Sequence, residues 1–234
     1  MWWRDHTRAQ GSLVAASLLV RELFGFLRDS TPARRRSRYG DMDYDWEQRV
    51  NTTAGAVDWR TRLLGVFHSP YQPTEPALFR EMMAALPIDF RKFTFIDIGS
   101  GKGRTLLMAT EYPFKAIIGV ELIAELHRAA DENTAAWRAR SPRQVAAIEA
   151  LRMDARQFEF PETPLVIYLF NPLPEAGLRQ TIRNLEKSWK QTPRAVWIVY
   201  HNPLLENVLT ESEIFAKERG EPEYSVFKAK PEAL

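Results

Sequence analysis

Residues 95–104, FIDIGSGKGR, carry the most specific chemical pattern in this 234-residue sequence. Glycines stand at positions 99, 101 and 103, and glycine lets a backbone turn tightly and approach a ligand closely. An apolar run precedes these glycines and a helical pattern follows, so the loop should join a strand to a helix. Asp97 falls at the carboxyl end of that strand, where open α/β sheets bind their ligands.

Three kinds of glycine loop can be separated by their spacing. A phosphate-binding P-loop requires G-x-x-x-x-G-K-[ST], but position 96 is isoleucine and Lys102 is followed by another glycine. A dinucleotide loop requires G-x-G-x-x-G, and here the last position is Arg104. The third pattern, D-x-G-x-G-x-G after the first strand, matches at every fixed position.

With this pattern the chain resembles the class I, seven-stranded S-adenosylmethionine-dependent methyltransferases. The resemblance covers residues 70–234, and it is nearest to uncharacterised bacterial members, with some likeness to Dot1-like and other lysine methyltransferases. It implies S-adenosylmethionine as the cofactor. The loop residues that it implies in cofactor binding are Asp97, Gly99, Ser100, Gly101 and Gly103.

Two acids downstream stand where the resembled family places cofactor ligands. Glu121 follows the apolar run 116–120, and a carboxylate there would accept two hydrogen bonds from the ribose diol, with Leu122 beside it. Asp154 follows a third run and would lie near the adenine amine, with the N–H of Ala155 available to a ring nitrogen. Taken alone, each acid could instead be a solvated residue at a helix N-terminus, where the helix dipole favours it.

Asn-Pro pairs follow the fourth and fifth apolar runs. Asn171-Pro172 resembles the N-P-P-[FY] signature of methyltransferases that act on planar nitrogens, but Leu173 and Pro174 replace its last two residues. Asn171 is therefore a candidate for both catalysis and cofactor binding, or an ordinary turn residue. His201, before the second pair, is a candidate general base near neutral pH or a structural residue.

A third candidate region lies upstream of the glycine loop. In the lysine methyltransferases that the chain resembles, a tyrosine-proline-hydroxyl segment closes over the methionine end of the cofactor, which implies roles for Tyr71 in catalysis and Thr74 in cofactor binding. Thr74 is also predicted to cap a helix that begins near Pro76 and continues through residues 78–86.

The elements that must position these residues alternate regularly. Apolar runs at 93–98, 116–120, 147–153, 165–170 and 195–200 are separated by helical patterns at 103–111, 122–139, 175–190 and 203–210. This alternation predicts a doubly wound α/β fold with a mostly parallel sheet. Residues 213–220 and 224–230 flank a short turn and should close the sheet as an antiparallel pair, making seven strands.

The N-terminal 69 residues are expected to form an extension of helices and loops before a methyltransferase domain at 70–234. A lid over the domain and a tether are the two roles considered for this extension. Residues 13–28 predict an amphipathic helix that packs on the main domain or binds a membrane surface or a partner, helped by the arginines up to residue 38. Charges at positions 21 and 22 make it a poor transmembrane helix. Residues 39–60 are expected to form an ordered loop or short turns.

Composition narrows the function further. The chain has no cysteine, which excludes disulfides, thiol nucleophiles and thiolate metal sites, and its four scattered histidines disfavour a metal site. The net charge of +2 favours no nucleic-acid partner. We expect a cytoplasmic methyltransferase, with membrane association as the alternative location, whose acceptor is unknown, with a slight preference for a protein amine such as lysine. The alternatives are a small-molecule methyltransferase, an NAD(P)-dependent oxidoreductase and a non-catalytic S-adenosylmethionine-binding protein.

Overall fold

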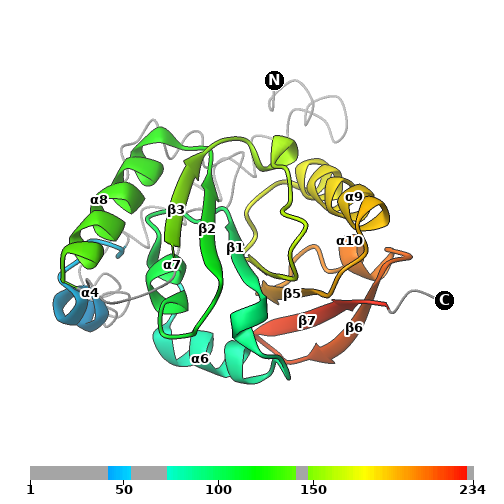
Figure 1. Ribbon diagram of the computed structural model, residues 1–234, viewed down its shortest axis with the longest axis horizontal. Coiled ribbons are helices and arrows are strands. Elements are labelled where there is room, and N and C mark those ends of the chain that lie inside the picture. The colour runs from blue at the N-terminus through cyan, green and yellow to red at the C-terminus, as the bar shows by residue number, and fades with distance from the viewer. Residues whose placement is uncertain (1–41, 54–72, 141–146, 231–234) are drawn as a thin grey trace, which may run out of the picture. The chain divides into compact units, whose positions relative to one another are not determined.

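The computed structural model describes residues 42–53, 73–140 and 147–230, most of which belong to one compact unit, Glu47–Leu234. Seven strands form a single sheet in the order β3-β2-β1-β4-β5-β7-β6. The strands are β1 Thr94–Ile98, β2 Ala116–Glu121, β3 Ala147–Arg152, β4 Leu165–Leu169, β5 Val196–His201, β6 Phe215–Gly220 and β7 Tyr224–Ala229. Figure 1 shows this sheet crossing the centre of the molecule.

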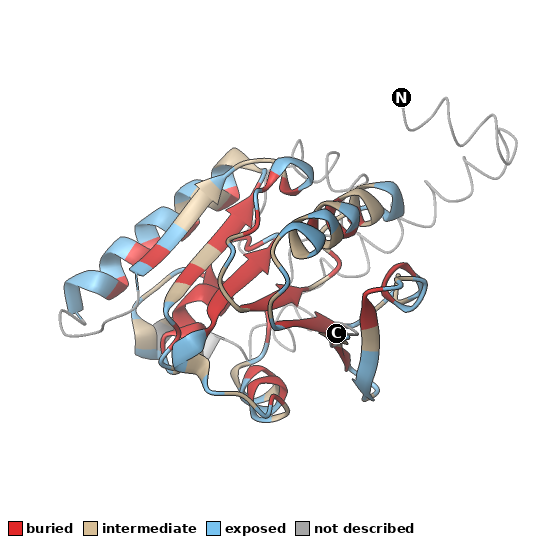
Figure 2. Cartoon of the chain, turned by 45° about the vertical axis from the view of Figure 1, so that its right-hand side comes forward, coloured by how far each residue is buried: buried red, intermediate tan, exposed pale blue. Residues whose placement is uncertain are grey.

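The sheet is parallel from β3 to β5 and antiparallel where β7 pairs with β5 and β6. The predicted doubly wound α/β sheet with a closing antiparallel pair is therefore confirmed. Continuous apolar runs explain the parallel part: every residue of β1, β4 and β5 is buried, as a strand covered on both faces requires. Figure 2 shows the buried centre and the exposed outer faces of the helices.

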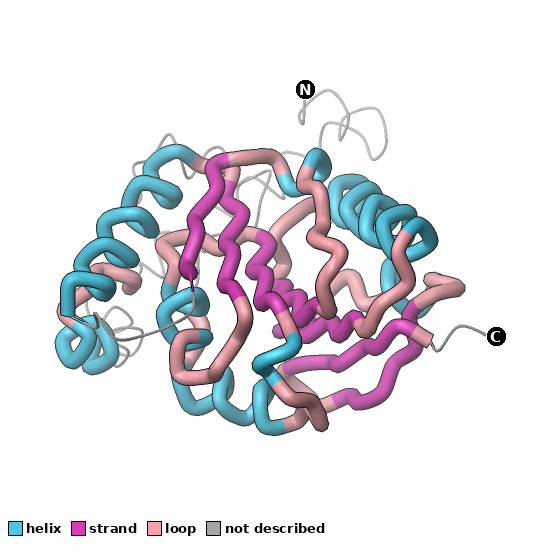
Figure 3. The backbone as a smooth tube through the Cα atoms, in the orientation of Figure 1, coloured by secondary structure: helices cyan, strands magenta, loops and turns pink. Residues whose placement is uncertain are grey.

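Helices cover both faces of the sheet, as Figure 3 shows. The α-helices are α4 Met42–Gln48, α6 Pro76–Ala84, α7 Arg104–Ala109, α8 Ala124–Arg140, α9 Glu175–Gln191 and α10 Asn207–Thr210. The described part of the chain also contains two 3₁₀ turns, η2 Phe90–Lys92 and η3 Ala155–Gln157. Within these described residues no helix is both long and apolar enough to cross a membrane.

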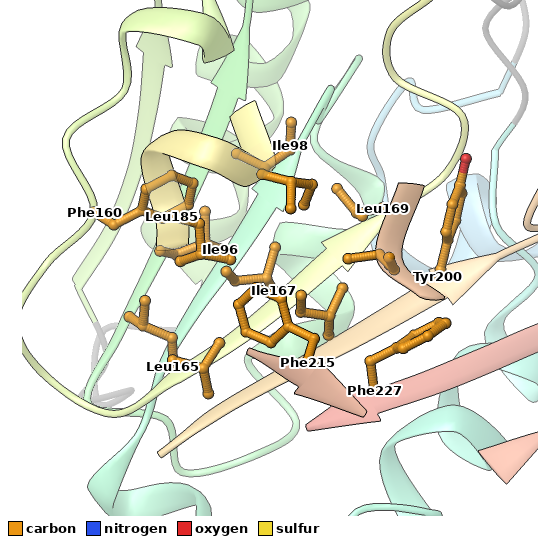
Figure 4. Packing of buried hydrophobic residues seen from close by; sticks show 14 of the residues in the cluster. Ile96, Ile98, Phe160, Leu165, Ile167, Leu169, Leu185, Tyr200, Phe215 and Phe227 are labelled. Carbon is orange, nitrogen blue, oxygen red and sulfur yellow. The ribbon is translucent and has the colours of Figure 1, made fainter. Parts of the chain in front are cut away.

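One face of the sheet holds the main apolar core. Strand residues that alternate along β1, β4 and β5, such as Ile96, Ile167 and Ile198, pack there with α9 and α10 side chains such as Leu185 and Leu209. Figure 4 shows part of this cluster from close by. Burying such side chains stabilises the fold by about 1.5–3 kcal/mol each.

The opposite face is more aromatic and more polar. Phe79 of α6 lies edge-on to Phe95, with ring centroids 5.9 Å apart, and it also lies 5.9 Å from Tyr168. Asp97 and Tyr168 are register partners on adjacent strands. Because side chains alternate along a strand, the residues next to Ile96 and Ile98 must face this second layer. The polar candidates therefore share one face of the sheet.

Three expectations about the elements differ from the structure. Residues 42–48 form a helix within the segment predicted as loop or short turns. The prediction missed this helix because fewer than two turns are too short to show a periodic pattern. Helix α6 is capped at Glu75, not at Thr74, whose side chain bonds elsewhere. The predicted helix at 203–210 is reduced to the last four of these residues. The predicted helix at 13–28 lies outside the described residues.

Candidate functional site

The order of the strands marks where a ligand should bind. Chain connections leave β1 toward β2 on one side, whereas β4 lies on its other side, so the sheet reverses its winding between β1 and β4. Open α/β sheets bind ligands outside the carboxyl ends of the strands at this switch point. The glycine loop after β1 and the Asn171-Pro172 turn after β4 both lie there.

The three loop glycines have backbone conformations that other residues rarely adopt. Gly99, Gly101 and Gly103 have φ angles of 82°, 54° and 79°, in the left-handed region that glycine enters without strain. A Cβ atom on Gly99 would also lie 2.6 Å from Cβ of Pro172. The loop after β1 is therefore packed directly on the turn after β4, and only glycine permits both the angle and the contact.

Glu121 closes the loop from the neighbouring strand. Its Oε2 accepts a hydrogen bond from Gly101 N at 2.9 Å, and its Oε1 accepts one from Ile123 N at 2.7 Å. Burial raises the pKa of this carboxyl, while these backbone N–H groups act in the opposite direction. The backbone N–H of Leu122 also bonds to this carboxylate, and since a carboxylate has about four acceptor positions, one remains for a ligand hydroxyl.

Asp97 lies beneath the loop and is 3% exposed. Its Oδ2 accepts a hydrogen bond from the Thr105 hydroxyl on α7. Burial raises the pKa of Asp97 to about 7, the bond from Thr105 opposes this rise, and the charge of Glu121 adds to it. Asp97 thus links β1 to the first turn of α7 by a hydrogen bond. This structural role is separate from the predicted role in cofactor binding.

Ser100 contributes a buried hydroxyl to the same loop. Its backbone N–H donates to Val120 O at 3.1 Å, and its side chain approaches the place that a Cβ on Gly119 would take, at 2.7 Å. Ser100 Oγ has no hydrogen-bond partner among the residues that the structure describes. Buried hydroxyls usually have a partner, so the position suits a bound polar group or an ordered water.

The remaining residues predicted to bind the cofactor lie at the ends of β2 and β3. Leu122 is 47% exposed, directly after Glu121. Asp154 caps η3 through Arg156 N at 2.9 Å and forms an ion pair with the Arg156 guanidinium at 2.5 Å, while Ala155 is buried. Asp154 therefore has the helix-terminal role that was its alternative interpretation, and no described contact tests a role toward adenine.

Asn171 and Asn202 form a matched pair of strained turns. Each precedes a proline, and their φ angles are 44° and 46°, which is uncommon for residues other than glycine. Asn171 Nδ2 donates to Asn202 O at 2.8 Å, and Asn171 Oδ1 accepts from Tyr200 OH at 3.0 Å. The side chain of Asn171 thus joins the ends of β4 and β5, and such strain concentrates at functional sites.

A buried hydrogen-bonded chain runs behind these turns. Thr74 Oγ1 lies 2.7 Å from Tyr168 OH, which lies 2.8 Å from His201 Nδ1. The imidazole also stacks on Phe170, with ring centroids 3.8 Å apart. Burial lowers the pKa of His201 to about 4. His201 is therefore neutral at neutral pH and a much weaker base than general-base catalysis at that pH favours.

The remaining expectations about the site concern Tyr71, a metal site and the grouping of the candidate residues. Tyr71, predicted to act in catalysis, lies outside the described residues. Within residues 42–53, 73–140 and 147–230, no three His, Asp or Glu side chains are grouped to hold a metal ion. The structure brings the glycine loop, Glu121 and Asn171 to one edge of the sheet, and it joins Thr74 to His201 through Tyr168.

Sequence reasoning missed the two basic side chains that flank Gly103. Lys102 and Arg104 both reach residues 51–53, about fifty positions earlier in the chain. Arg104 is 2% exposed although it begins α7. A charged residue beside a glycine loop is ordinarily interpreted as solvated, and no local pattern marks residues 51–53, so the only available signal was the alternation of glycine with basic residues.

Comparison with known proteins supports the fold alone. No family model matches the chain, and no curated protein matches it. Among solved structures, the PH0226 protein from Pyrococcus horikoshii is 14% identical with a TM-score of 0.50, over 75% of this chain and 100% of that one. At such identity the match shows a shared architecture and says nothing about chemistry.

Two further similar structures are methyltransferases. An RNA methyltransferase from Salinibacter ruber, solved with S-adenosyl-L-homocysteine, is 18% identical over 69% of this chain and 95% of that one, with a TM-score of 0.46. A ribosomal protein L11 methylase from Lactobacillus delbrueckii is 17% identical over 66% and 75%, with a TM-score of 0.43. These scores are too low to carry an argument about the function of this chain.

Proposed function

We propose that this protein is an S-adenosylmethionine-dependent methyltransferase. The observation that carries the proposal is the loop at the switch point, where three left-handed glycines are closed by Glu121 from the end of the second strand. The D-x-G-x-G-x-G pattern of the resembled family supplies the identity of the ligand. The seven-stranded sheet is compatible with it.

The residues present fit this cofactor. Gly99 is exposed and has no side chain, so a ligand can approach the loop backbone closely there, and the Glu121 carboxylate keeps an acceptor position for a ribose hydroxyl. Ser100 offers a buried hydroxyl without a described partner. Leu122, exposed beside Glu121, supplies an apolar surface for the base. The site thus offers one carboxylate acceptor, backbone amides and apolar contacts, a combination that suits a nucleoside.

S-adenosylmethionine supplies an already activated methyl group, so the protein needs neither a metal nor a covalent nucleophile for the transfer. What the chain contributes is alignment. The two Asn-Pro turns border the site and are held rigidly by Asn171, which fixes the wall on which an acceptor would rest. Neutral His201 places no positive charge there, so it does not repel a protonated amine, which must release its proton to solvent before its nitrogen attacks the methyl group.

The proposed acceptor is a protein amine such as lysine, with a small molecule as the other possibility within the same function. The preference rests on the arginine-rich first 40 residues, which carry a net charge of +5 and would attract an acidic protein surface. Pairing of the Asn171 side chain with Asn202 and Tyr200 reduces its availability to a planar substrate nitrogen. An adenine or glutamine acceptor is accordingly not preferred.

Transfer of a labelled methyl group tests this function and identifies the acceptor class. The full chain is incubated with methyl-labelled S-adenosylmethionine and cell extract, and the label is followed after protease or nuclease treatment. We expect protease-sensitive label with the wild type and at least a tenfold loss with Glu121→Gln, because the amide nitrogen of glutamine must face one of the N–H donors, of Gly101 or of Ile123. The exposed Glu125→Gln on α8 is the control. Equal label with and without the wild-type protein would contradict the proposal.

A further inference from the structure

Residues 48–53, hereafter the strap, lie against the glycine loop and α8. Eight side-chain or backbone groups of this short segment take part in hydrogen bonds with residues 102–140. Thr52 is completely buried. Nothing in the D-x-G-x-G-x-G pattern requires such a segment. We propose that the strap is a positioning element that holds the glycine loop in its cofactor-binding conformation, an inference that rests on the proposed function.

Asn133, in the middle of α8, is the centre of this arrangement. Its Oδ1 accepts from Asn51 N at 2.8 Å, and its Nδ2 donates to Asn51 O and to Lys102 O, each at 3.0 Å. One side-chain amide therefore joins three segments: the helix, the strap and the loop. Asn133 is 5% exposed, and buried amides with all these bonds satisfied specify a single arrangement of their neighbours.

The loop contacts the strap through two basic side chains, one between Gly101 and Gly103 and one directly after Gly103. Lys102 Nζ donates to Thr53 O at 2.9 Å and to Asn51 Oδ1 at 3.3 Å. Arg104 Nε donates to Thr52 Oγ1 at 2.6 Å, and its Nη2 donates to Thr53 Oγ1 at 3.3 Å. Both residues that alternate with Gly101 and Gly103 are thus anchored to the same segment.

The loop needs such support for an entropic reason. Gly99, Gly101 and Gly103 make it unusually free in the absence of other contacts, and glycine loses more conformational freedom on ordering than any other residue. Whatever orders the loop before the cofactor arrives reduces the cost of binding. Bonds from the strap do this at Lys102 and Arg104, between and after the glycines, without occupying the glycine backbone.

This arrangement makes the coupling reciprocal. If the strap stabilises the loop conformation that binds the cofactor, then the cofactor must stabilise the docked strap by the same free energy. Asn133 and Lys102 are therefore positioning residues, which act on the cofactor through the loop. The inference distinguishes them from residues that only stabilise the fold, because a purely structural role requires no response of the strap to the ligand.

The first test measures S-adenosylhomocysteine affinity by calorimetry with full-length variants. Lys102→Met removes the charged donor and both of its hydrogen bonds to the strap, and we expect binding to be weaker by about tenfold or more. Lys102→Arg, which keeps donors in reach of Thr53 O, should restore affinity to within about threefold of wild type. Asn133→Ala should also weaken binding, whereas Thr134→Val, which loses only a bond to its own helix, should not.

The second test follows hydrogen exchange at single amides. Saturating S-adenosylhomocysteine should slow exchange of the Asn51 amide, which donates to Asn133, by at least fivefold. The Glu221 amide, bonded to Tyr224 O in the distant β6–β7 hairpin, should keep its rate and so reports any global effect.

The outcomes separate the two proposals. Wild-type protein that binds no S-adenosylhomocysteine would overturn the proposed function, and the strap inference with it. Wild-type binding together with unchanged affinity in folded Lys102→Met, or an unchanged Asn51 exchange rate, would overturn the strap inference alone. Should Asn133→Ala fail to fold, the partly exposed Lys102 pair and the exchange experiment still decide it.

Discussion

At the scale of single residues, the site contains buried acidic, hydroxyl and imidazole groups that are hydrogen-bonded to one another. Asp97 is bound by Thr105, and Tyr168 lies between Thr74 and His201. Burial raises the pKa of Asp97 and Tyr168 and lowers that of His201. All three shifts favour the uncharged form, because desolvation penalises charge. Stability should therefore depend on pH through these groups.

Asp97 gives the clearest prediction of this dependence. Between pH about 4 and about 7 the folded protein retains a proton on Asp97 that the unfolded chain has released, because its folded pKa is about 7 against a reference of 3.8. The contribution of Asp97 to stability therefore falls as pH rises through this window and is constant above it. Asp97→Asn carries no such proton, so its stability relative to wild type should rise with pH.

Urea unfolding of both proteins at several pH values between 4 and 8 measures this difference, expected to grow by on the order of a few kcal/mol. His201 has the opposite dependence, since its lowered pKa makes the unfolded chain bind more protons between pH about 4 and 6.5. It is present in both proteins and cancels. A difference that stays constant with pH would show that Asp97 is charged in the folded state.

Residue types in the sequence indicated part of this site. Glu121 could be found because it follows a recognisable strand and lies in register with a motif. The Thr74–Tyr168–His201 chain could not, because its members are 94 and 33 positions apart and come together only through the sheet. The histidine was recognised as notable, but its lowered pKa depends on burial that no local pattern reveals.

At the scale of elements, the site depends on two turns that touch. The glycine loop after β1 and the Asn-Pro turn after β4 pack so closely that Gly99 leaves no room for a side chain beside Pro172. The Asn-Pro turn is itself joined to the end of β5 by the hydrogen bond from the Asn171 side chain to Asn202 O. The strand ends therefore behave as one unit, and a change in either turn should reach the cofactor loop.

Gly99→Ala tests this contact. A methyl group at 2.6 Å from Pro172 Cβ, with φ at 82°, should destabilise the protein by about 2 kcal/mol or more and abolish measurable S-adenosylhomocysteine binding. Gly177→Ala, within α9, is the matched control, because its Cβ would meet Leu173 at an ordinary 3.4 Å. This variant should stabilise the protein by about 0.5–1 kcal/mol. Thermal unfolding and calorimetry of both variants measure the two effects; equal behaviour would refute the proposed packing.

Elements with strong patterns were predictable, and short or isolated ones were not. The five parallel strands appear as continuous apolar runs because both of their faces are buried. Helix α4 and the strap carry no periodic signal over their few residues, and the strap gains its position from contacts distant in sequence, such as Asn51 with Asn133. The compact unit that holds the strap begins at Glu47, and the domain boundary expected near residue 70 stays a prediction.

At the scale of the whole molecule, the order of the strands places the site. Parallel β1 and β4 lie side by side although two helices and two strands separate them in sequence, and their carboxyl ends open at the switch point of the sheet. Alternating strand and helix patterns predicted this topology, since parallel crossovers are almost always right-handed. Many unrelated functions share such sheets, so the ligand identity rests on the loop and Glu121.

Calorimetric titration of the full chain with S-adenosylmethionine, S-adenosylhomocysteine and NAD tests the central claim most directly. The account predicts micromolar binding of both sulfur-containing ligands and no heat with NAD. Binding of NAD alone would contradict it in favour of an oxidoreductase, although the spacing of the glycines opposes that function. Absence of binding to the two sulfur-containing ligands, in protein shown to be folded, would contradict the claim that this loop is a cofactor site.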